Sequence, residues 1–334
     1  MSNSTGSSQY VATIESVSTC PVKCEMCPVS RTDVAQPNSQ LMSLETAAVV
    51  AARLKNEFGV GFVSWGNWGE PLVHPQMTEL SRVFAEAGLD NQFLSSSLSA
   101  KFDVEAFVKS NISHLDISIS GMTAGVYNVG HKHGKWDLIQ RNMEEISEMR
   151  ARFPGRLQVD IRWHRYKHNE FQLEAARAWA AELGFTFKPY YAHLGGVDAL
   201  HDYEHGKLEQ SKLNFVRENV FLEFVEGLIA QHRGETSCPM NKNLIIHPDG
   251  RLLHCCALMA SHQSGVDFLT KSRAEIVQFK DGGNPYCGEC LAKGWAGFTH
   301  ASKTEADLPQ APAPPPALPY SRPTPGSGIV KNQI

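Results

Sequence analysis

The chain has 334 residues, of which 42% are hydrophobic, and a formal net charge of −4. This length and composition indicate one large or two ordinary domains with a substantial core. The slightly acidic balance, with a pI of about 6.4, excludes a broad basic surface for nucleic acid.

No apolar, uncharged run of about 18 residues occurs, so we expect no membrane span. The polar start, "MSNSTGSSQY", lacks the apolar stretch of a secretory signal. Eight cysteines without an export signal indicate a reducing, cytoplasmic location. Clustered thiols bind metals there more often than they form disulfides.

The two ends of the chain have compositions that disfavour a packed fold. Residues 1–9 are serine-rich, and residues 305–334, with "PQAPAPPPALPYSRPTPGSG", are proline-rich. We expect the tail to be disordered or polyproline, because such segments lack the apolar side chains of a core. The preferred interpretation is a solvated tail, and partner binding is the alternative.

Between the ends, short apolar strands alternate with amphipathic helices. The predicted strands are residues 10–18, 60–65, 92–99, 114–120, 157–163 and 185–191. The helices predicted between them are residues 43–59, 77–88, 103–111, 136–153 and 170–184. This six-fold alternation predicts an α/β fold with a parallel sheet, a partial (β/α)6 TIM-like barrel. Functional side chains should lie at the carboxyl ends of its strands.

The pattern changes after residue 200. Residues 212–232 predict one helix, and "NLIIHPDGRLLHCC" (243–256) predicts a hairpin with a Pro-Asp-Gly turn. We therefore predict a core domain over residues 10–214 and a small α+β domain over residues 215–304. The second unit holds five of the eight cysteines.

Three cysteines, Cys20, Cys24 and Cys27, follow the first predicted strand with C-x3-C-x2-C spacing. Three thiolates can hold a [4Fe–4S] cluster and leave one iron open. The spacing resembles the radical S-adenosylmethionine (SAM) superfamily. The resemblance implies that SAM chelates the open iron and is cleaved reductively to a 5′-deoxyadenosyl radical. The alternative is a zinc site that borrows a distant histidine as its fourth ligand.

A second element supports this resemblance. "WGNWGEP" (65–71) follows the second predicted strand and is similar to the family's Gly-Gly-Glu-Pro motif, which binds the SAM amino group. The matched positions, with tryptophan in place of the first glycine, are Trp68, Gly69, Glu70 and Pro71. The resemblance also implies SAM contacts from Ser118, after the fourth strand, and from Arg162, on the fifth strand. Ser120 replaces the family's common acid, and "SSS" (95–97) receives no role.

The second cysteine set resembles the twitch domain, the short form of the SPASM domain. The resemblance implies an auxiliary [4Fe–4S] cluster on Cys238, Cys255, Cys287 and Cys290. A zinc ribbon on the same four thiols is the alternative. Cys256 is left over, because the spacing after Gly250 favours Cys255 as the ligand. We interpret Cys256 as a hydrogen donor to a substrate radical or as a packing residue.

Family relatives modify either sugars and aminocyclitols or peptides. Relatives that modify peptides often carry an added N-terminal peptide-binding domain, whereas this sequence has nine residues before the first predicted strand. We therefore expect the substrate to be a small sugar, aminocyclitol or glycosylated natural-product intermediate. We expect its epimerisation rather than its dehydrogenation or decarboxylation. A peptide- or protein-modifying maturase and a non-catalytic iron–sulfur or zinc protein are the alternatives. The expected partner is a reductant such as flavodoxin or ferredoxin. Polar side chains on the loops are further, weaker candidates for substrate binding. They are Tyr127, His131, His133, His164, Arg165, Tyr190, Tyr191 and His193.

Overall fold

The computed structural model describes residues 10–28 and 40–300. The predictions for the serine-rich start and the proline-rich tail concern segments outside these residues. None of the helices within the described ranges combines the length and the apolar character needed to cross a bilayer.

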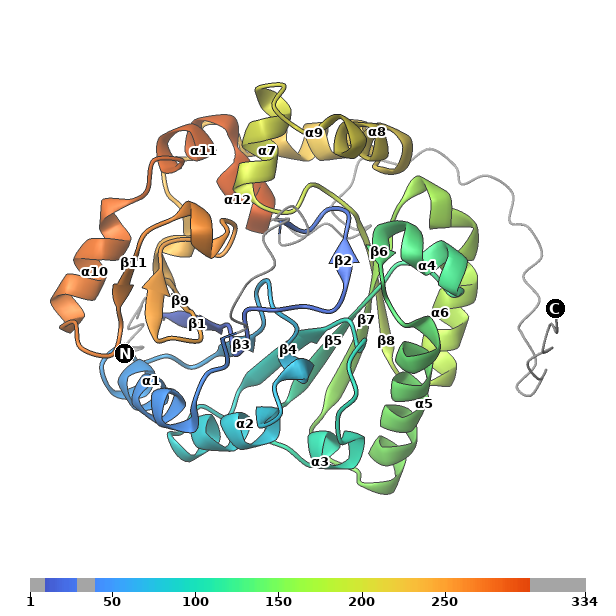
Figure 1. Ribbon diagram of the computed structural model, residues 1–334, viewed down its shortest axis with the longest axis horizontal. Helices are drawn as coiled ribbons and strands as arrows, with labels where there is room; N and C mark the ends of the chain where they lie inside the picture. The colour runs from blue at the N-terminus through green and yellow to red at the C-terminus, as the bar shows by residue number, and fades with distance from the viewer. Residues whose placement is uncertain (1–9, 29–39, 301–334) are drawn as a thin grey trace, which may run out of the picture.

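Six parallel strands form most of a nine-stranded sheet (Figure 1). In spatial order they are β1 (Val11–Ile14), β3 (Val63–Trp65), β4 (Gln92–Ser96), β5 (His114–Ile119), β7 (Gln158–Arg165) and β8 (Thr186–Tyr191). Their order along the chain matches their order in the sheet, as right-handed crossovers through helices produce. The predicted partial (β/α)6 barrel is confirmed.

Helices connect these strands and cover the outer face of the sheet (Figure 1). They are α1 (Leu44–Asn56), α2 (Met77–Glu86), α3 (Val104–Val108), α4 (Ala124–Gly130), α5 (Trp136–Arg152) and α6 (Leu173–Glu182). Short 3-10 turns, η2 (Pro71–Val73) and η3 (Lys167–Gln172), lie beside the strand ends. Ser43 caps α1 as predicted, because its side chain accepts a hydrogen bond from the backbone N–H of Thr46.

The C-terminal hairpin continues the same sheet. Its strands are β9 (Asn243–Ile246), β10 (Arg251–Leu253) and β11 (Gly265–Asp267). β9 pairs with β1 in parallel, and β10 and β11 follow in antiparallel order. Strand β9 therefore lies next to β1 in the sheet, although these two strands are far apart in the sequence. A division between domains at residue 214 stays a prediction.

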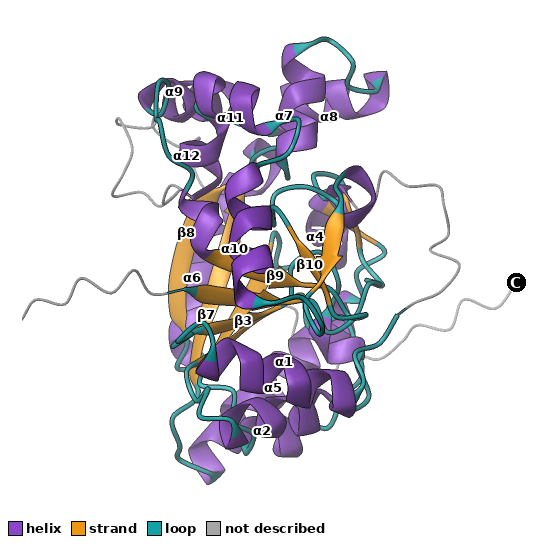
Figure 2. Ribbon diagram, turned by 90° about the vertical axis from the view of Figure 1, so that its left-hand side faces the viewer, coloured by secondary structure: helices purple, strands orange, loops and turns teal. Residues whose placement is uncertain are grey.

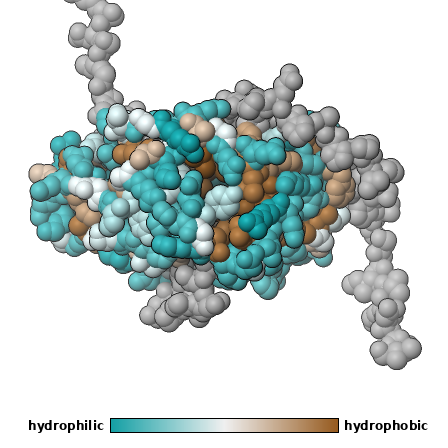
Figure 3. All heavy atoms as spheres, turned by 90° about the horizontal axis from the view of Figure 1, so that it is seen from above, coloured by the Kyte–Doolittle hydropathy of each residue, from teal (hydrophilic) through white to brown (hydrophobic). Residues whose placement is uncertain are grey.

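A layer of helices stands over the carboxyl ends of the strands (Figures 1 and 2). It contains α7 (Val197–Glu204), α8 (Gln210–Asn219), α9 (Leu222–Gln231), α11 (Cys287–Lys293) and α12 (Trp295–His300), while α10 (Arg273–Gly282) flanks β11. Seen from above, this end carries mostly hydrophilic side chains with a band of apolar ones (Figure 3).

One helix prediction is wrong. Residues 212–232 were expected to form a single helix, but α8 ends at Asn219 and α9 begins at Leu222. Val220 between them takes an extended conformation and is fully buried in the apolar cluster of this layer. Burial of this β-branched side chain outweighs continuation of the helix.

The barrel interior is charged where closed barrels carry branched apolar side chains. Arg162 pairs with Asp116, which is 2% exposed, and Lys188 pairs with Asp160. His114 Nε2 lies 2.7 Å from Asp160 Oδ2. Burial raises the pKa of Asp116, and the Arg162 charge opposes that shift. These ion pairs compensate the charges of the side chains that lie inside the open barrel.

Candidate active site

A pocket of about 440 Å³ opens at the carboxyl ends of the strands. Of the residues expected at the first site, it is lined by Cys20, Cys24, Cys27, Trp68, Gly69, Glu70, Ser118, Arg162 and Cys256. Segments distant in sequence thus meet where the barrel fold was expected to place chemistry. Pro71 is buried and begins η2 instead.

The three-cysteine loop is held on two sides. Cys24 lies in the short strand β2 (Lys23–Cys24), which pairs with β6 (His131–Lys132). On the other side, Gly195 N donates to Met26 O at 3.0 Å, and a Cβ on Gly195 would lie 2.3 Å from that oxygen. A glycine is therefore required where the loop after β8 meets the cysteine loop.

The Trp68–Gly69 segment is anchored by Glu15, a residue that the sequence analysis missed. Glu15 Oε1 accepts from the backbone N–H groups of Trp68 and Gly69 at 3.2 and 3.0 Å. Gly69 also passes so close to the neighbouring chain that a Cβ would lie 1.8 Å from Val17 O. Burial raises the pKa of Glu15, partly offset by His247 at 3.9 Å.

Glu70 is 3% exposed and both of its carboxylate oxygens are occupied by this chain. Oε1 accepts from Ser96 Oγ at 2.7 Å and from Leu72 N at 3.3 Å. Oε2 accepts from the backbone N–H and the hydroxyl of Ser97 at 2.8 and 2.6 Å. The serine run that received no role in the sequence analysis therefore fixes the acidic residue of the motif.

Ser118 and Arg162 face the pocket from neighbouring strands, where β5 and β7 pair them in register. Besides its pairing with Asp116, the Arg162 guanidinium lies 5.6 Å from the centre of the Tyr190 ring. The Asp116 carboxylate and the Tyr190 ring therefore both hold the Arg162 guanidinium in position. Ser120 lies deeper, with its hydroxyl 2.5 Å from His131 Nδ1.

The four cysteines of the second set line another, smaller pocket: Cys238, Cys255, Cys287 and Cys290. Two backbone N–H groups point to these sulfurs, Ala257 N to Cys255 at 3.4 Å and Asn284 N to Cys287 at 3.2 Å. Such N–H···S contacts are common around iron–sulfur clusters, whose potential they tune. All eight cysteines are free thiols in this structure.

Lys280 is buried beside the second set, and no sequence pattern predicts its burial there. Its ammonium donates to His254 O at 2.5 Å. Burial lowers the pKa of Lys280 to about 8, opposed by the nearby Cys255, Cys256 and Cys238. A buried cation at this place would compensate the negative charge of the four sulfurs if they bound a metal cluster as thiolates.

Cys255 and Cys256 line different pockets, although Cys256 Sγ lies 3.1 Å from Met240 Sδ, a residue of the smaller one. Cys255 lines the smaller pocket with the second set, while Cys256 lines the pocket of the three-cysteine loop. With its amide oriented to satisfy both partners, Asn67 donates to Cys256 O and accepts from the Trp68 indole, each at 3.1 Å. The tryptophan in the first glycine position of the motif thus helps join the motif loop to the segment around Cys256.

Aromatic and imidazole groups form another part of the pocket wall. His131, His164, Tyr190 and His193 line it, whereas Tyr127, Arg165 and Tyr191 are buried and do not. Nε2 of His164 has no hydrogen-bond partner among the described residues. Burial lowers the pKa of His164 well below its usual range, so the ring is neutral at pH 7.

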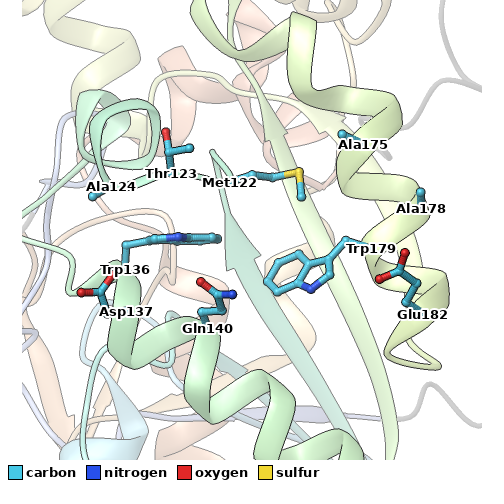
Figure 4. A pocket seen from close by; sticks show the side chains of 10 residues that line it. All are labelled: Met122, Thr123, Ala124, Trp136, Asp137, Gln140, Ala175, Ala178, Trp179 and Glu182. Atoms are coloured by element: carbon cyan, nitrogen blue, oxygen red, sulfur yellow. The ribbon is translucent and has the colours of Figure 1, made fainter. Parts of the chain in front are cut away.

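A further pocket of about 430 Å³ lies outside the barrel, between α5 and α6 (Figure 4). Trp136 and Trp179 form its apolar wall, and Asp137 and Glu182 lie at its edges. None of the residues predicted for the active site lines it. The residues predicted for the three-cysteine site line the pocket inside the barrel instead.

Comparison with known families gives one match. Residues 14–153 match the model of the radical SAM superfamily. This range includes the three cysteines and the Gly-Glu-Pro element. The chain carries a radical SAM domain. A comparison with curated proteins found no match.

Solved structures of other proteins share the fold. Native anSMEcpe with bound AdoMet (SAM) aligns with a TM-score of 0.52 at 14% identity, over 80% of each chain. SuiB of Streptococcus suis bound to S-adenosylmethionine gives 0.56 at 14% identity, over 85% of this chain and 68% of SuiB. SuiB bound to its precursor peptide SuiA gives 0.57 at 15% identity, over 85% and 67%.

The radical SAM domain takes SAM and a [4Fe–4S] cluster as cofactors, and the residues present fit them. Burial raises the pKa of Cys20 to about 12, and that of Cys24 also rises, with mutual repulsion among the thiols adding to it. Thiols that resist ionisation without a cation, as Cys20 and Cys24 do, are suited to a metal cluster, which supplies the positive charge. Cys20, Cys24 and Cys27 would hold the cluster, and the polar groups beside them in the same pocket would bind SAM.

Proposed function

We propose that this protein is a radical SAM enzyme that epimerises a small sugar, aminocyclitol or glycosylated natural-product intermediate. The observation that carries the proposal is the position of Cys256, which lines the same pocket as Cys20, Cys24 and Cys27. A thiol that faces the reacting carbon can return a hydrogen atom to it. The neighbouring Cys255 belongs to a different pocket, so Cys256 is left for this task.

In this proposal each set of residues has one role. Cys20, Cys24 and Cys27 bind the cluster with the open iron, and Trp68, Gly69, Glu70, Pro71, Ser118 and Arg162 form or support the SAM site. Glu70 acts mainly by holding its own loop, since Ser96 and Ser97 occupy its carboxylate. Arg162 is the cation available for the SAM carboxylate. Cys238, Cys255, Cys287 and Cys290 bind the auxiliary cluster, which transfers electrons or positions the substrate.

When bound, SAM and its cluster supply a 5′-deoxyadenosyl radical that takes a hydrogen atom from a substrate C–H bond. The planar substrate radical then receives the hydrogen of the Cys256 S–H group on its opposite face, which inverts the centre. The sulfur radical left on Cys256 takes up one electron and one proton to restore the thiol. Each turnover therefore uses two electrons from a low-potential reductant such as flavodoxin or ferredoxin, one of them for SAM cleavage.

The pocket wall suits a polar substrate of modest size. Neutral His164 and the hydroxyl of Tyr190 can bind substrate hydroxyl or amino groups. The pocket, at about 440 Å³, is in the range of small-molecule sites, which supports a sugar-type substrate over a folded protein. Peptide modification is the second candidate, favoured by the similarity to SuiB, which was solved with its precursor peptide.

Replacing Cys256 with alanine should separate SAM cleavage from product formation. In deuterated water, wild-type protein given a panel of aminosugars and aminocyclitols should install one solvent deuterium at an inverted carbon. The variant should still form 5′-deoxyadenosine but release no epimer, as mass spectrometry and NMR would detect. Cys256→Ser should behave alike, because a hydroxyl is a poor hydrogen-atom donor.

The matched control is Met240→Leu, which removes the sulfur that lies 3.1 Å from Cys256 Sγ but keeps the thiol. It should retain epimerisation. Normal turnover by Cys256→Ala would show that Cys256 only packs. A ketone or a decarboxylated product from the wild type would show oxidative chemistry instead, and turnover of peptides alone would favour the second candidate.

A further inference from the structure

A cluster of two histidines and a glutamate lies outside both pockets. It consists of His201 on α7, His205 at the end of α7, and Glu289 on α11. One potential ligand atom from each residue lies within 4.8 Å of the other two. Helices α7 and α11 run side by side in both ribbon views (Figures 1 and 2).

The geometry of this cluster resembles a preformed metal site. His205 Nε2 lies 2.7 Å from Glu289 Oε1, and His201 Nε2 lies 3.7 Å from Oε2 of the same carboxylate. The backbone N–H of His205 donates to His201 O at 3.0 Å, so the two rings project from one face of a helical turn. Their centres are 4.4 Å apart. Small side-chain rotations would bring three ligands around one ion.

Neighbouring groups support metal binding. The other ring nitrogen of His201, Nδ1, lies 3.5 Å from Asp202 Oδ1. A carboxylate in this position fixes the tautomer and orientation of a metal-binding imidazole. Lys293, whose charge acts on Glu289, is directed to Glu204 Oε2 at 3.3 Å. Side-chain exposures of 21% for His201 and 32% for Glu289 leave the cluster open to an ion from solution.

The geometry points to a zinc-type divalent cation site formed by His201, His205 and Glu289, with the remaining position open to water. Two imidazoles and a carboxylate are a ligand set that Zn²⁺ prefers, and Mg²⁺ or Ca²⁺ would require more oxygen ligands. This inference does not depend on the proposed epimerisation.

The place of the site in the fold gives it a structural consequence. The start of α7 is tied to the chain beside Cys256, where Val197 N donates to Ala257 O at 2.7 Å. Helix α11 carries Cys287 and Cys290. An ion shared by α7 and α11 would therefore hold the C-x2-C helix against the segment that borders the main pocket.

The test is an anaerobic calorimetric titration of cluster-loaded protein with Zn²⁺, with iron measured before and after. We expect one Zn²⁺ per chain, bound without loss of iron, and a thermal unfolding midpoint that rises with Zn²⁺. His201→Ala and His205→Ala should each weaken binding by at least about 10-fold and remove the thermal shift. The matched control is His232→Ala, because His232 also pairs with a glutamate, Glu235 at 2.7 Å, but has no second histidine there.

Three results would overturn the site. The first is a wild-type protein that binds no Zn²⁺ at 100 µM while its clusters stay intact. The second is equal Zn²⁺ affinity in the wild type and the His201→Ala/His205→Ala double variant. Binding lost in His232→Ala but kept in the double variant would place the ion elsewhere and count against it in the same way.

Discussion

Replacing Cys20, Cys24 and Cys27 together with alanine should abolish 5′-deoxyadenosine formation from SAM. The three thiols line one pocket, and burial raises the pKa of Cys20 and Cys24, so a metal cluster that supplies positive charge favours their thiolates. Without them no thiolate remains on that loop to hold iron. The second set would be untouched, so about four irons should remain in the reconstituted variant, the content of one cubane cluster.

The control for this variant is Cys256→Ala, which removes a thiol from the same pocket but should leave SAM cleavage intact. 5′-Deoxyadenosine would be measured by chromatography and mass spectrometry with dithionite as reductant, and iron by a colorimetric assay. Residual SAM cleavage by the triple variant above the level of cluster-free protein would refute the ligand assignment. Loss of all iron would instead show that the two cysteine sets load together.

Glu70→Ala should weaken SAM binding and also destabilise the fold. Removal of the carboxylate leaves the hydroxyls of Ser96 and Ser97 and the backbone N–H of Ser97 without an acceptor in a buried place. Each unpaired buried group costs roughly 1–3 kcal/mol in the free energy of unfolding. The loop that carries Trp68 and Gly69 should shift with it, so we expect SAM affinity to fall by roughly 1.5–3 kcal/mol, about 10- to 150-fold.

SAM affinity would be measured by equilibrium binding to cluster-loaded protein, and stability by chemical denaturation. Glu70→Gln is the matched variant, because its amide oxygen keeps one acceptor and should lose less of both quantities. Ser97→Ala, which removes one donor to the carboxylate but leaves the carboxylate in place, should have the smallest effect. Unchanged SAM affinity in Glu70→Ala would show that the motif loop is held by Glu15 and the backbone alone.

The sequence predicted the barrel well because its signals are local. Apolar runs such as residues 114–120 and capped amphipathic helices such as residues 43–59 each report on their own segment, and β5 and α1 form there. The cysteine loop was equally accessible, since C-x3-C-x2-C spacing is contained in eight residues. The family match over residues 14–153 supports this part of the account.

The sequence could not predict contacts between distant segments. Nothing in "VATIES" marks Glu15 as the acceptor for Trp68 and Gly69, 53 and 54 positions away. In the same way, Ser97 meets Glu70 only because β3 and β4 are neighbours in the sheet. The pairing of β9 with β1 and the burial of Lys280 likewise depend on tertiary packing. These contacts decide how the motif residues are held.

We expect the two cysteine sets to hold two four-iron clusters, one on each set, with Cys256 lining the pocket of the first. The most direct test is the iron, sulfide and zinc content of the wild-type protein after anaerobic reconstitution and desalting. The account predicts about eight irons and eight sulfides per chain, the content of two cubane clusters. About four irons, with zinc that is lost when Cys238, Cys255, Cys287 and Cys290 are replaced, would contradict it, because the second set would then be a zinc ribbon.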